Sequence, residues 1–356
     1  MPQPHQHVKS EPNYRILGIE SSCDETAAAV VENGVTVLSN VVASQAAIHA
    51  RFGGVFPEVA SRQHLLTFPP VIEQSLKDAH LDLADIDAIA VTRGPGLPGS
   101  LVVGVNIAKG LALVSGKPLI GVHHLEAHLL SIDLIEERHQ IGYPAVGLVV
   151  SGGHTELVVI EEPLIYKSLG FTLDDAAGEA FDKVARLLNL PYPGGPSIQT
   201  AAKNGNPQAF AFPRAWLEGS WNFSFSGLKT AVLREVKRLE RYGTGIPVED
   251  LAASFQQAVV DVLVGKTLLA AETYRAQSIL VVGGVSANLA LREAFRRQST
   301  LPVFIPPAHL CTDNAAMTAV VGFHRFLKGQ RDAFDMDVLP TWPLSALSES
   351  VLASLC

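Results

Sequence analysis

The chain has 356 residues, more than one ordinary hydrophobic core serves, and this length predicts two domains of about 150 residues each. It carries 27 Lys and Arg against 35 Asp and Glu, a formal net charge of −8, and this acidic excess argues against a protein that coats nucleic acid indiscriminately. A hydrophobic fraction of 47% with 17% charged residues excludes a disordered chain and predicts a well-buried globular one.

The cysteines and the apolar segments indicate the compartment. Three scattered cysteines, Cys23, Cys311 and Cys356, cannot form a disulfide framework and indicate a reducing environment. No apolar run is expected to reach the length of a membrane span, about 18 to 20 residues. Residues 1–15 lack the apolar centre of a signal peptide. We therefore expect a cytoplasmic protein without a membrane partner, with a flexible tail at residues 1–13 and a C-terminal tail at 346–356.

One arrangement of elements occurs twice in the chain. A buried strand leads into a short loop of polar residues, and a second strand follows. The first copy comprises strand 15–20, loop 21–26 and strand 27–32, and the second comprises strand 145–150, loop 151–155 and strand 156–160. Asn33-Gly34 predicts a hairpin turn after the first copy. The copies lie about 130 residues apart, near the period of a duplicated domain.

Between and after these copies, strands and helices alternate. The expected elements are strand 88–92, a glycine-proline loop at 93–99, helix 100–115, strand 118–122, helix 124–134, helix 248–275, strand 278–282, a glycine turn at 283–288, a helix after it, strand 303–305 and a last helix from about residue 313. Such alternation predicts an α/β fold with parallel strands and covered faces. Two α/β halves leave a cleft between them, where we expect the ligand.

Glycine-rich turns favour a nucleotide or phosphate ligand in that cleft. They lie at Ser151-Gly152-Gly153, Gly194-Gly195 and Gly283-Gly284. Without a Cβ in the way, backbone N–H groups can approach an anion closely. None of the turns matches the phosphate-loop or the dinucleotide-binding pattern, which argues against a phosphate-loop ATPase and a nicotinamide enzyme.

A histidine pair suggests a metal site. His124 and His128 are four residues apart in a predicted helix, so one face can present both to one ion. Glu126 between them points away, whereas Asp313 could supply a third ligand and leave coordination positions open. The structural alternative is that one histidine caps the helix, the other packs against the sheet, and Asp313 is a helix N-cap. The His-Glu-x-x-His pattern of zinc peptidases is absent.

The segment 174–183 carries carboxylates on two faces of a predicted helix. This pattern usually forms a solvated face or ion pairs such as Glu179 with Lys183. A glycine-rich turn follows at 192–196, so Asp182 is also a candidate for binding ribose hydroxyls.

Basic residues recur at helical spacing further along the chain: Lys229, Arg234, Lys237 or Arg238, and Arg241. Such a stripe is most often solvated surface. In an otherwise acidic protein, it is also a candidate contact for nucleic-acid phosphates.

Nine motifs in a fixed order resemble those of one enzyme family. They are Gly18-Ile-Glu-Ser-Ser-Cys-Asp-Glu-Thr26, Gly53-Gly-Val-Phe-Pro-Glu58, His123-His-Leu-Glu-Ala-His128, Ser151-Gly-Gly-His-Thr155, Gly178-Glu-Ala-Phe-Asp-Lys183, Tyr192-Pro-Gly-Gly-Pro196, Phe223-Ser-Phe-Ser-Gly-Leu-Lys229, Gly283-Gly-Val-Ser-Ala-Asn288 and Cys311-Thr-Asp-Asn314. Together they resemble the TsaD family, the tRNA N6-adenosine threonylcarbamoyltransferases, from about residue 14 to about residue 327.

The resemblance implies the actin-like/Hsp70-like ATPase (ASKHA) fold, in which two duplicated α/β subdomains surround a nucleotide cleft. We expect residues 14–130 plus 313–345 to form subdomain I and residues 131–312 to form subdomain II. The implied reaction moves the threonylcarbamoyl group of L-threonylcarbamoyladenylate to N6 of the adenosine 3′ to the anticodon, in tRNAs reading codons that begin with A, and releases AMP. Such a reaction needs a polarised carbonyl and a bound adenylate more than a strong nucleophile, so no Ser/His/Asp triad is expected.

The resemblance also implies roles for single residues. His124, His128 and Asp313 match the metal ligands, with one Fe2+ per subunit and Zn2+ as the alternative. The residues that match substrate-binding positions are Val149, Val150, Ser151, Gly152 and Gly153 for the phosphate and acyl part, and Asp182, Gly195 and Asn288 for the adenosine and its ribose. As a hypothesis, Asp24, Glu25 and His154 are catalytic polar residues of the cleft, and Asp24 or Glu25 orients the attacking amine.

The family further implies tRNA as a substrate and TsaB-like and TsaE-like proteins as partners of bacterial members, whereas mitochondrial members act alone. The N-terminal segment does not resemble an arginine-rich transit peptide, which favours the bacterial type. Three other functions stay open: a sugar or acid kinase on the same fold, a metallopeptidase, and a non-catalytic tRNA- or nucleotide-binding subunit. The kinase would need magnesium and ATP but not the histidine pair.

Overall fold

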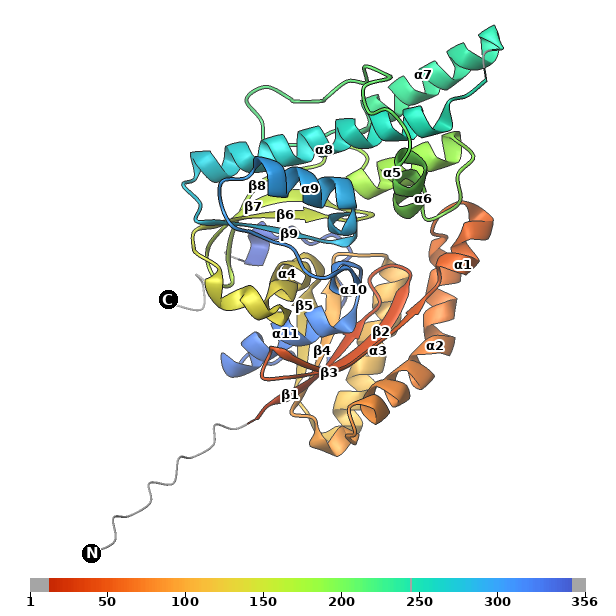
Figure 1. Ribbon diagram of the computed structural model, residues 1–356. Helices are drawn as coiled ribbons and strands as arrows, with labels where there is room; N and C mark the ends of the chain where they lie inside the picture. Colours follow the sequence, from red (N-terminus) through yellow and green to blue (C-terminus); the bar gives the residue numbers. More distant parts are fainter. Residues whose placement is uncertain (1–12, 244, 348–356) are drawn as a thin grey trace, which may run out of the picture.

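The computed structural model describes residues 13–243 and 245–347, so the expected tails and Cys356 lie almost wholly outside the described residues. Two five-stranded sheets with helices on their faces form two halves, which Figure 1 shows one above the other. The strands are β1 (Arg15–Glu20), β2 (Glu25–Glu32), β3 (Thr36–Ser44), β4 (Ala88–Gly94) and β5 (Leu119–His123) in the first sheet, and β6 (Ala145–Val150), β7 (Thr155–Glu162), β8 (Ile165–Phe171), β9 (Ser278–Val282) and β10 (Val303–Phe304) in the second.

The two sheets repeat one topology. The first has the order β3-β2-β1-β4-β5, and the second, read from its other edge, has the order β8-β7-β6-β9-β10. In each sheet the first strand pairs antiparallel with the second and parallel with the fourth. Asn33 and Gly34, at φ 54° and 71°, make the hairpin turn between β2 and β3. The expected duplication of an α/β unit is confirmed.

Helices cover both sheets. They are α1 (Ala46–His49), α2 (Pro57–Asp78), α3 (Pro98–Ser115), α4 (His124–Leu130), α5 (Ala177–Leu187), α6 (Gly194–Ala202), α7 (Ser226–Tyr242), α8 (Val248–Thr273), α9 (Leu289–Gln298), α10 (Ala308–Cys311) and α11 (Ala315–Leu327). Short 3₁₀ turns include Ser131–Leu134 after α4 and Gly284–Ala287 after β9.

The alternation of side chains along β1 builds two cores on the first sheet. Ile16 packs with Val320 of α11 on one face, while Leu17 packs with Phe68 of α2 on the other. Gly18 allows α11 to approach closely, because a Cβ there would lie 2.2 Å from the carbonyl oxygen of Ala315. A helix from the C-terminal part of the chain is therefore fixed against the first strand.

Helix α4 lies between the two halves. Leu125 and Leu129 pack in the core of the second sheet with Val149, whereas Ala127 and Leu130 pack with α11 and the first sheet. The helix is therefore buried on opposite sides by different halves of the chain, and Figure 1 shows it between the two sheets.

Some expected boundaries were wrong. The helix expected from residue 100 begins at Pro98, because proline suits the first helical turn. The helix expected to reach residue 134 ends at Leu130 and continues as a 3₁₀ turn. The last helix begins at Ala315, and its N-cap is Asn314, whose side chain accepts a hydrogen bond from the Met317 amide (3.2 Å).

Helix α3 corrects the expectation that no segment suits a membrane span. With 18 residues and a mean hydropathy of 1.4, it is the one helix among the described residues that is long and apolar enough to cross a membrane. In this fold, however, Val105, Ala108 and Ala112 pack in the core formed by the first sheet and α2. The buried side of α3 accounts for much of its apolar character.

Candidate functional site

A cavity of about 600 Å³ opens where the two halves meet. The loop between β1 and β2 lines one side, and the corresponding loop between β6 and β7 lines another. The duplicated strand-loop-strand unit therefore brings both of its loops to one site. The lining also includes the start of α5, the turn before α6, the glycine turn after β9, the segment before α11 and the loop between β4 and α3.

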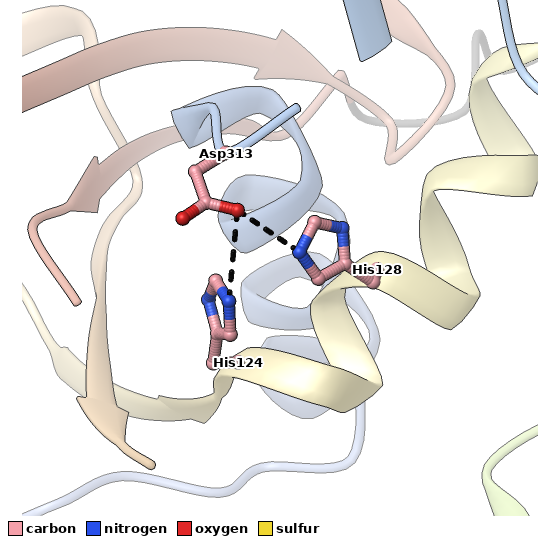
Figure 2. Close-up of side chains that lie close together, drawn as sticks. All are labelled: His124, His128 and Asp313. Carbon is pink, nitrogen blue, oxygen red and sulfur yellow. Dashed lines mark hydrogen bonds and ion pairs between the residues drawn. The ribbon is translucent and has the colours of Figure 1, made fainter. Parts of the chain in front are cut away.

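The predicted metal ligands meet at this cavity. Figure 2 shows His124 and His128, one turn apart on α4, both directed at the carboxylate of Asp313. The Oδ1 atom of Asp313 lies 3.1 Å from Nε2 of His128 and 3.7 Å from Nε2 of His124, and the three ligand atoms lie within 4.8 Å of one another. Donor atoms that each bind one divalent ion at about 2.0 to 2.2 Å stand at similar separations. The geometry fits a metal ion with open coordination positions.

Neither member of the histidine pair nor Asp313 caps a helix, so that part of the structural alternative was wrong. The cap of α4 is His123, whose Nδ1 accepts from the amides of Leu125 (3.2 Å) and Glu126 (3.4 Å). Asn314 caps α11, which leaves the Asp313 carboxylate available. Glu126 forms an ion pair with Arg325 (2.7 Å), and its orientation away from the histidines is confirmed.

The charges at this cluster stabilise one another. Burial alone would lower the pKa of His124, but the charges of Asp313 and Glu20 outweigh it and raise this pKa to about 9. Burial would raise the pKa of Asp313, yet His124 and His128 hold it well below its usual range. At neutral pH, a protonated His124 therefore lies next to the ionised carboxylate of Asp313, and a bound divalent cation would replace the proton.

The Ser151–Gly153 loop lies beside the metal-ligand cluster and is held by the start of α5. The Gly178 amide donates to the carbonyl of Ser151, and the Glu179 amide donates to that of Gly152, each at 3.1 Å. At Gly152 and Gly153, a Cβ would meet nothing within 4 Å, so both glycines border open space. Their backbone can approach an anionic ligand without obstruction.

Val149 and Val150, at the end of β6, do not line the cavity. Both have 0% exposure, and their side chains pack in the two cores on either face of the second sheet. Strand pairing fixes their side chains on the two faces of the sheet, so neither residue reaches the cavity.

The three expected adenosine-binding residues all line the cavity, and each comes from a different element. Asp182 of α5 accepts a hydrogen bond from the Gly194 amide (2.7 Å), and burial raises its pKa. Gly195 lies in the first turn of α6, and a Cβ there would meet nothing within 4 Å. Asn288 caps α9 through its oxygen, while its amide nitrogen donates to Gln256 (2.8 Å).

The three hypothesised catalytic residues also line the cavity. Burial, followed by the negative charges of Asp24 and Asp313, raises the pKa of Glu25 to about 9. Burial, followed by the charges of His124 and His128, lowers the pKa of His154 to about 4. The site thus holds a protonated carboxyl group and a neutral imidazole at pH 7.

The sequence of this chain matches one enzyme family over most of its length. The sequence profile of TsaD, described as tRNA N6-adenosine threonylcarbamoyltransferase, matches residues 36–320. The chain belongs to the TsaD family. A relative from Moorella thermoacetica with that same name is 54% identical over 334 residues, which cover 93% of this chain and 97% of the relative.

Solved structures with low sequence identity share the fold of this chain. HypF of T. kodakarensis superposes with a TM-score of 0.59 at 15% identity, covering 90% of this chain and 49% of HypF. Component A of the (R)-2-hydroxyglutaryl-CoA dehydratase of Acidaminococcus fermentans superposes with a TM-score of 0.55 at 16% identity, covering 88% of this chain and 98% of its own. With the repeated sheet topology, these likenesses confirm the expected ASKHA fold.

The cavity lining includes motif residues for which the sequence predicted no role, among them Tyr192 and Cys23. Tyr192 lines the cavity, and burial together with the charges of Asp24 and Asp182 raises its pKa. Cys23 lines it as well, and burial raises the pKa of its thiol. The sequence signal for both was their place in the motifs, where Tyr192 lies close to Gly194-Gly195 and Cys23 lies next to Asp24.

The basic stripe lies on α7, outside the cavity lining. Arg234, Lys237 and Arg241 are exposed, whereas Arg238 forms an ion pair with Glu235 on the same helix. The expected pair of Glu179 with Lys183 is confirmed at 2.8 Å.

Proposed function

We propose that this protein transfers the threonylcarbamoyl group of L-threonylcarbamoyladenylate to N6 of the adenosine 3′ to the anticodon, in tRNAs reading codons that begin with A, and releases AMP. Membership of the TsaD family supports this reaction. The observation that carries the proposal is that the His124, His128 and Asp313 cluster and the Ser151–Gly153 loop border the same cavity. A metal-ligand cluster and an open glycine loop on one cavity suit an acyl phosphate.

The adenylate occupies the side of the cavity that the second half supplies. The amides of Gly152 and Gly153 donate hydrogen bonds to its phosphate, because no side chain obstructs the approach of an anion to this loop. Asp182 and Asn288 hold the adenosine and its ribose, and Gly195 leaves room for them. The Ser151 side chain borders the acyl part, and Val149 and Val150 of β6 hold the Ser151–Gly153 loop in place behind it.

His124, His128 and Asp313 would hold one divalent metal ion, which we propose to be Fe2+, with Zn2+ as the alternative. Imidazole and carboxylate ligands suit both ions. When bound, the ion supplies Lewis-acid polarisation of the threonylcarbamoyl group or an anchor for it.

The remaining polar residues act on the incoming adenosine. Asp24 or Glu25 orients the N6 amine by accepting or donating a hydrogen bond. N6 forms its bond to the carbamoyl carbon as the bond to the AMP oxygen breaks, and the proton that N6 loses leaves with the AMP phosphate or passes to solvent. His154 is neutral at pH 7 because burial lowers its pKa to about 4, so it can accept a hydrogen bond from a group that loses a proton.

A transfer assay tests the function. Purified protein, synthetic threonylcarbamoyladenylate and unmodified tRNA are combined, and modified adenosine is detected by mass spectrometry of nucleosides. We expect product with the wild type and none with the His124→Ala/His128→Ala variant. If product is still absent after TsaB-like and TsaE-like proteins are added, the transferase function is wrong, and magnesium-dependent ATP turnover becomes the next assay.

The setting of the enzyme is part of the same proposal. We propose that it works in the cytoplasm, with tRNA and with TsaB-like and TsaE-like partners, and away from membranes. We also propose that residues 14–130 plus 313–345 form subdomain I and residues 131–312 form subdomain II. The packing of α11 against β1 supports this division, because it joins a late segment to the first sheet.

A further inference from the structure

Glu20 ends strand β1 with a fully buried carboxyl group. Its exposure is 0%. Glutamate is almost never fully buried unless other groups pair with its carboxylate. Removing a carboxylate from water costs several kcal/mol, so an apolar residue would usually stabilise a strand end better. Neither the sequence motifs nor the proposed reaction assigns this residue a task.

The contacts of Glu20 converge on one metal ligand. Its Oε2 atom lies 3.3 Å from Nδ1 of His124 and accepts a hydrogen bond from the hydroxyl of Thr92 (2.5 Å). Thr318 of α11 contacts the same oxygen at 3.4 Å, and the Ser22 amide donates to Oε1 at 2.6 Å. Groups from β4, α11 and the β1–β2 loop therefore fix the carboxylate from several sides.

An ionised carboxylate only accepts hydrogen bonds, so contact with Glu20 requires a proton on Nδ1 of His124. The lone pair of a neutral His124 then lies on Nε2, the atom that stands 3.7 Å from Oδ1 of Asp313. The hydroxyl of Ser22 also lies 3.2 Å from Nδ1, but it can donate or accept and selects no tautomer. Nδ1 of His128, by contrast, is buried without a hydrogen-bond partner in the described part of the chain.

We propose that Glu20 is a positioning residue that orients His124 and selects the tautomer that binds the metal. This inference rests on the metal site of the proposed function. Glu20 touches neither the ion nor the substrate but acts through the imidazole, which its charge makes a stronger ligand. Thr92 and Thr318 hold the carboxylate in place.

Glu20→Gln tests the proposal because it conserves shape but removes the charge. The amide would place its NH₂ group against either the Ser22 N–H or Nδ1–H of His124, so one of the two contacts is lost. Apo protein is titrated with Co2+ alone, and affinity is measured by competition with a chelating indicator. We expect binding to weaken about 10- to 100-fold, with a changed ligand-field absorption spectrum of the bound Co2+.

Two further variants separate positioning from folding. Thr92→Val removes one donor to Glu20 and should weaken Co2+ binding less than Glu20→Gln does. Ser75→Ala breaks a buried hydrogen bond to Ser39 (2.8 Å) in the same half of the molecule, and it should lower the melting temperature while Co2+ affinity stays at the wild-type value.

The outcomes distinguish the two proposals. Wild-type Co2+ affinity in folded Glu20→Gln and Thr92→Val proteins would overturn the role of Glu20 and leave the metal site standing. If Glu20→Gln does not fold, Thr92→Val alone decides in the same way. Absence of Co2+ binding by the wild type would overturn the metal site, and the role of Glu20 with it.

Discussion

Nε2 of His128 lies 3.1 Å from Oδ1 of Asp313, although 185 residues separate them in the chain. Two packing contacts produce this pair. Helix α4 is wedged between the halves, and α11 is pressed against β1 at Gly18. The metal-ligand cluster therefore depends on how the last helix returns to the first sheet.

Asp313→Asn should abolish metal retention while the protein still folds. An asparagine keeps the shape of the side chain but removes the negative charge that balances a cation beside two neutral histidines. We expect the metal content of the purified protein, measured by inductively coupled plasma mass spectrometry, to fall at least about 10-fold.

Glu126→Gln is the matched control for Asp313→Asn. Glu126 lies on α4 between the two histidines, but it pairs with Arg325 and not with the cluster. Breaking this largely buried pair should lower the free energy of unfolding by about 3 kcal/mol while metal content stays unchanged. Equal metal loss in both variants would contradict the ligand assignment.

Glu25→Gln should change how stability depends on pH. The pKa of Glu25 rises from an ordinary 4.5 to about 9 in the folded protein, so the folded chain retains a proton that the unfolded chain has lost. The wild type should therefore lose stability as pH rises between these two values, by up to about 1 kcal/mol per pH unit. Glu25→Gln cannot titrate, so its stability, measured by urea unfolding, should decline less steeply with pH than that of the wild type, which also carries the contribution of His124.

The exposed residue Glu218 offers a control for this pH dependence. Glu218→Gln should give a stability curve parallel to that of the wild type. A decline of equal slope in the Glu25→Gln protein would show that Glu25 does not hold its proton in the fold.

Gly178→Ala should impair adenylate binding through the loop it supports. A Cβ at this position would lie 2.6 Å from the Ser151 carbonyl oxygen and 2.7 Å from Gly152 Cα, and backbone atoms cannot swing aside as a side-chain end can. We expect a loss of stability of about 1 to 3 kcal/mol and a clear rise in the dissociation constant of the adenylate, measured by calorimetry.

Gly110, in the middle of α3, provides the control because a Cβ there would meet nothing within 4 Å. Gly110→Ala should stabilise the protein by up to about 1 kcal/mol, since alanine favours helix, and should leave adenylate affinity unchanged. If Gly178→Ala binds adenylate as the wild type does, the loop does not hold the ligand.

Reversal of charge on α7 tests whether the basic stripe contacts tRNA. Lys237 and Arg241 are exposed there and have no acidic partner among the ion pairs of the described residues. In Lys237→Glu/Arg241→Glu, KM for tRNA should rise, and its salt dependence should become shallower by about one unit of log-log slope per lost phosphate contact. KM for the adenylate should not change.

Arg297→Glu, at an exposed position of α9, reverses a comparable charge elsewhere on the second half. It should leave KM for tRNA near the wild-type value. An equal rise in both proteins would indicate a general effect of net charge and would contradict a specific contact at α7.

The local features of this protein were determined by its sequence. Strand-loop-strand repetition predicted the duplicated sheets, because alternating burial and turn residues act over a few positions. The spacing of His124 and His128 placed them on one helical face, and it directed Glu126 away. Motif resemblance then identified the family that the comparisons confirm.

Only the tertiary structure decided which distant groups meet. It brought Asp313 to the histidines, placed Glu20 behind His124, and sent the side chains of Val149 and Val150 into the cores. It also gave the helix caps to His123 and Asn314 rather than to the predicted ligands. Such outcomes depend on the packing of whole helices against sheets. No local spacing encodes the distance between side chains more than a hundred residues apart.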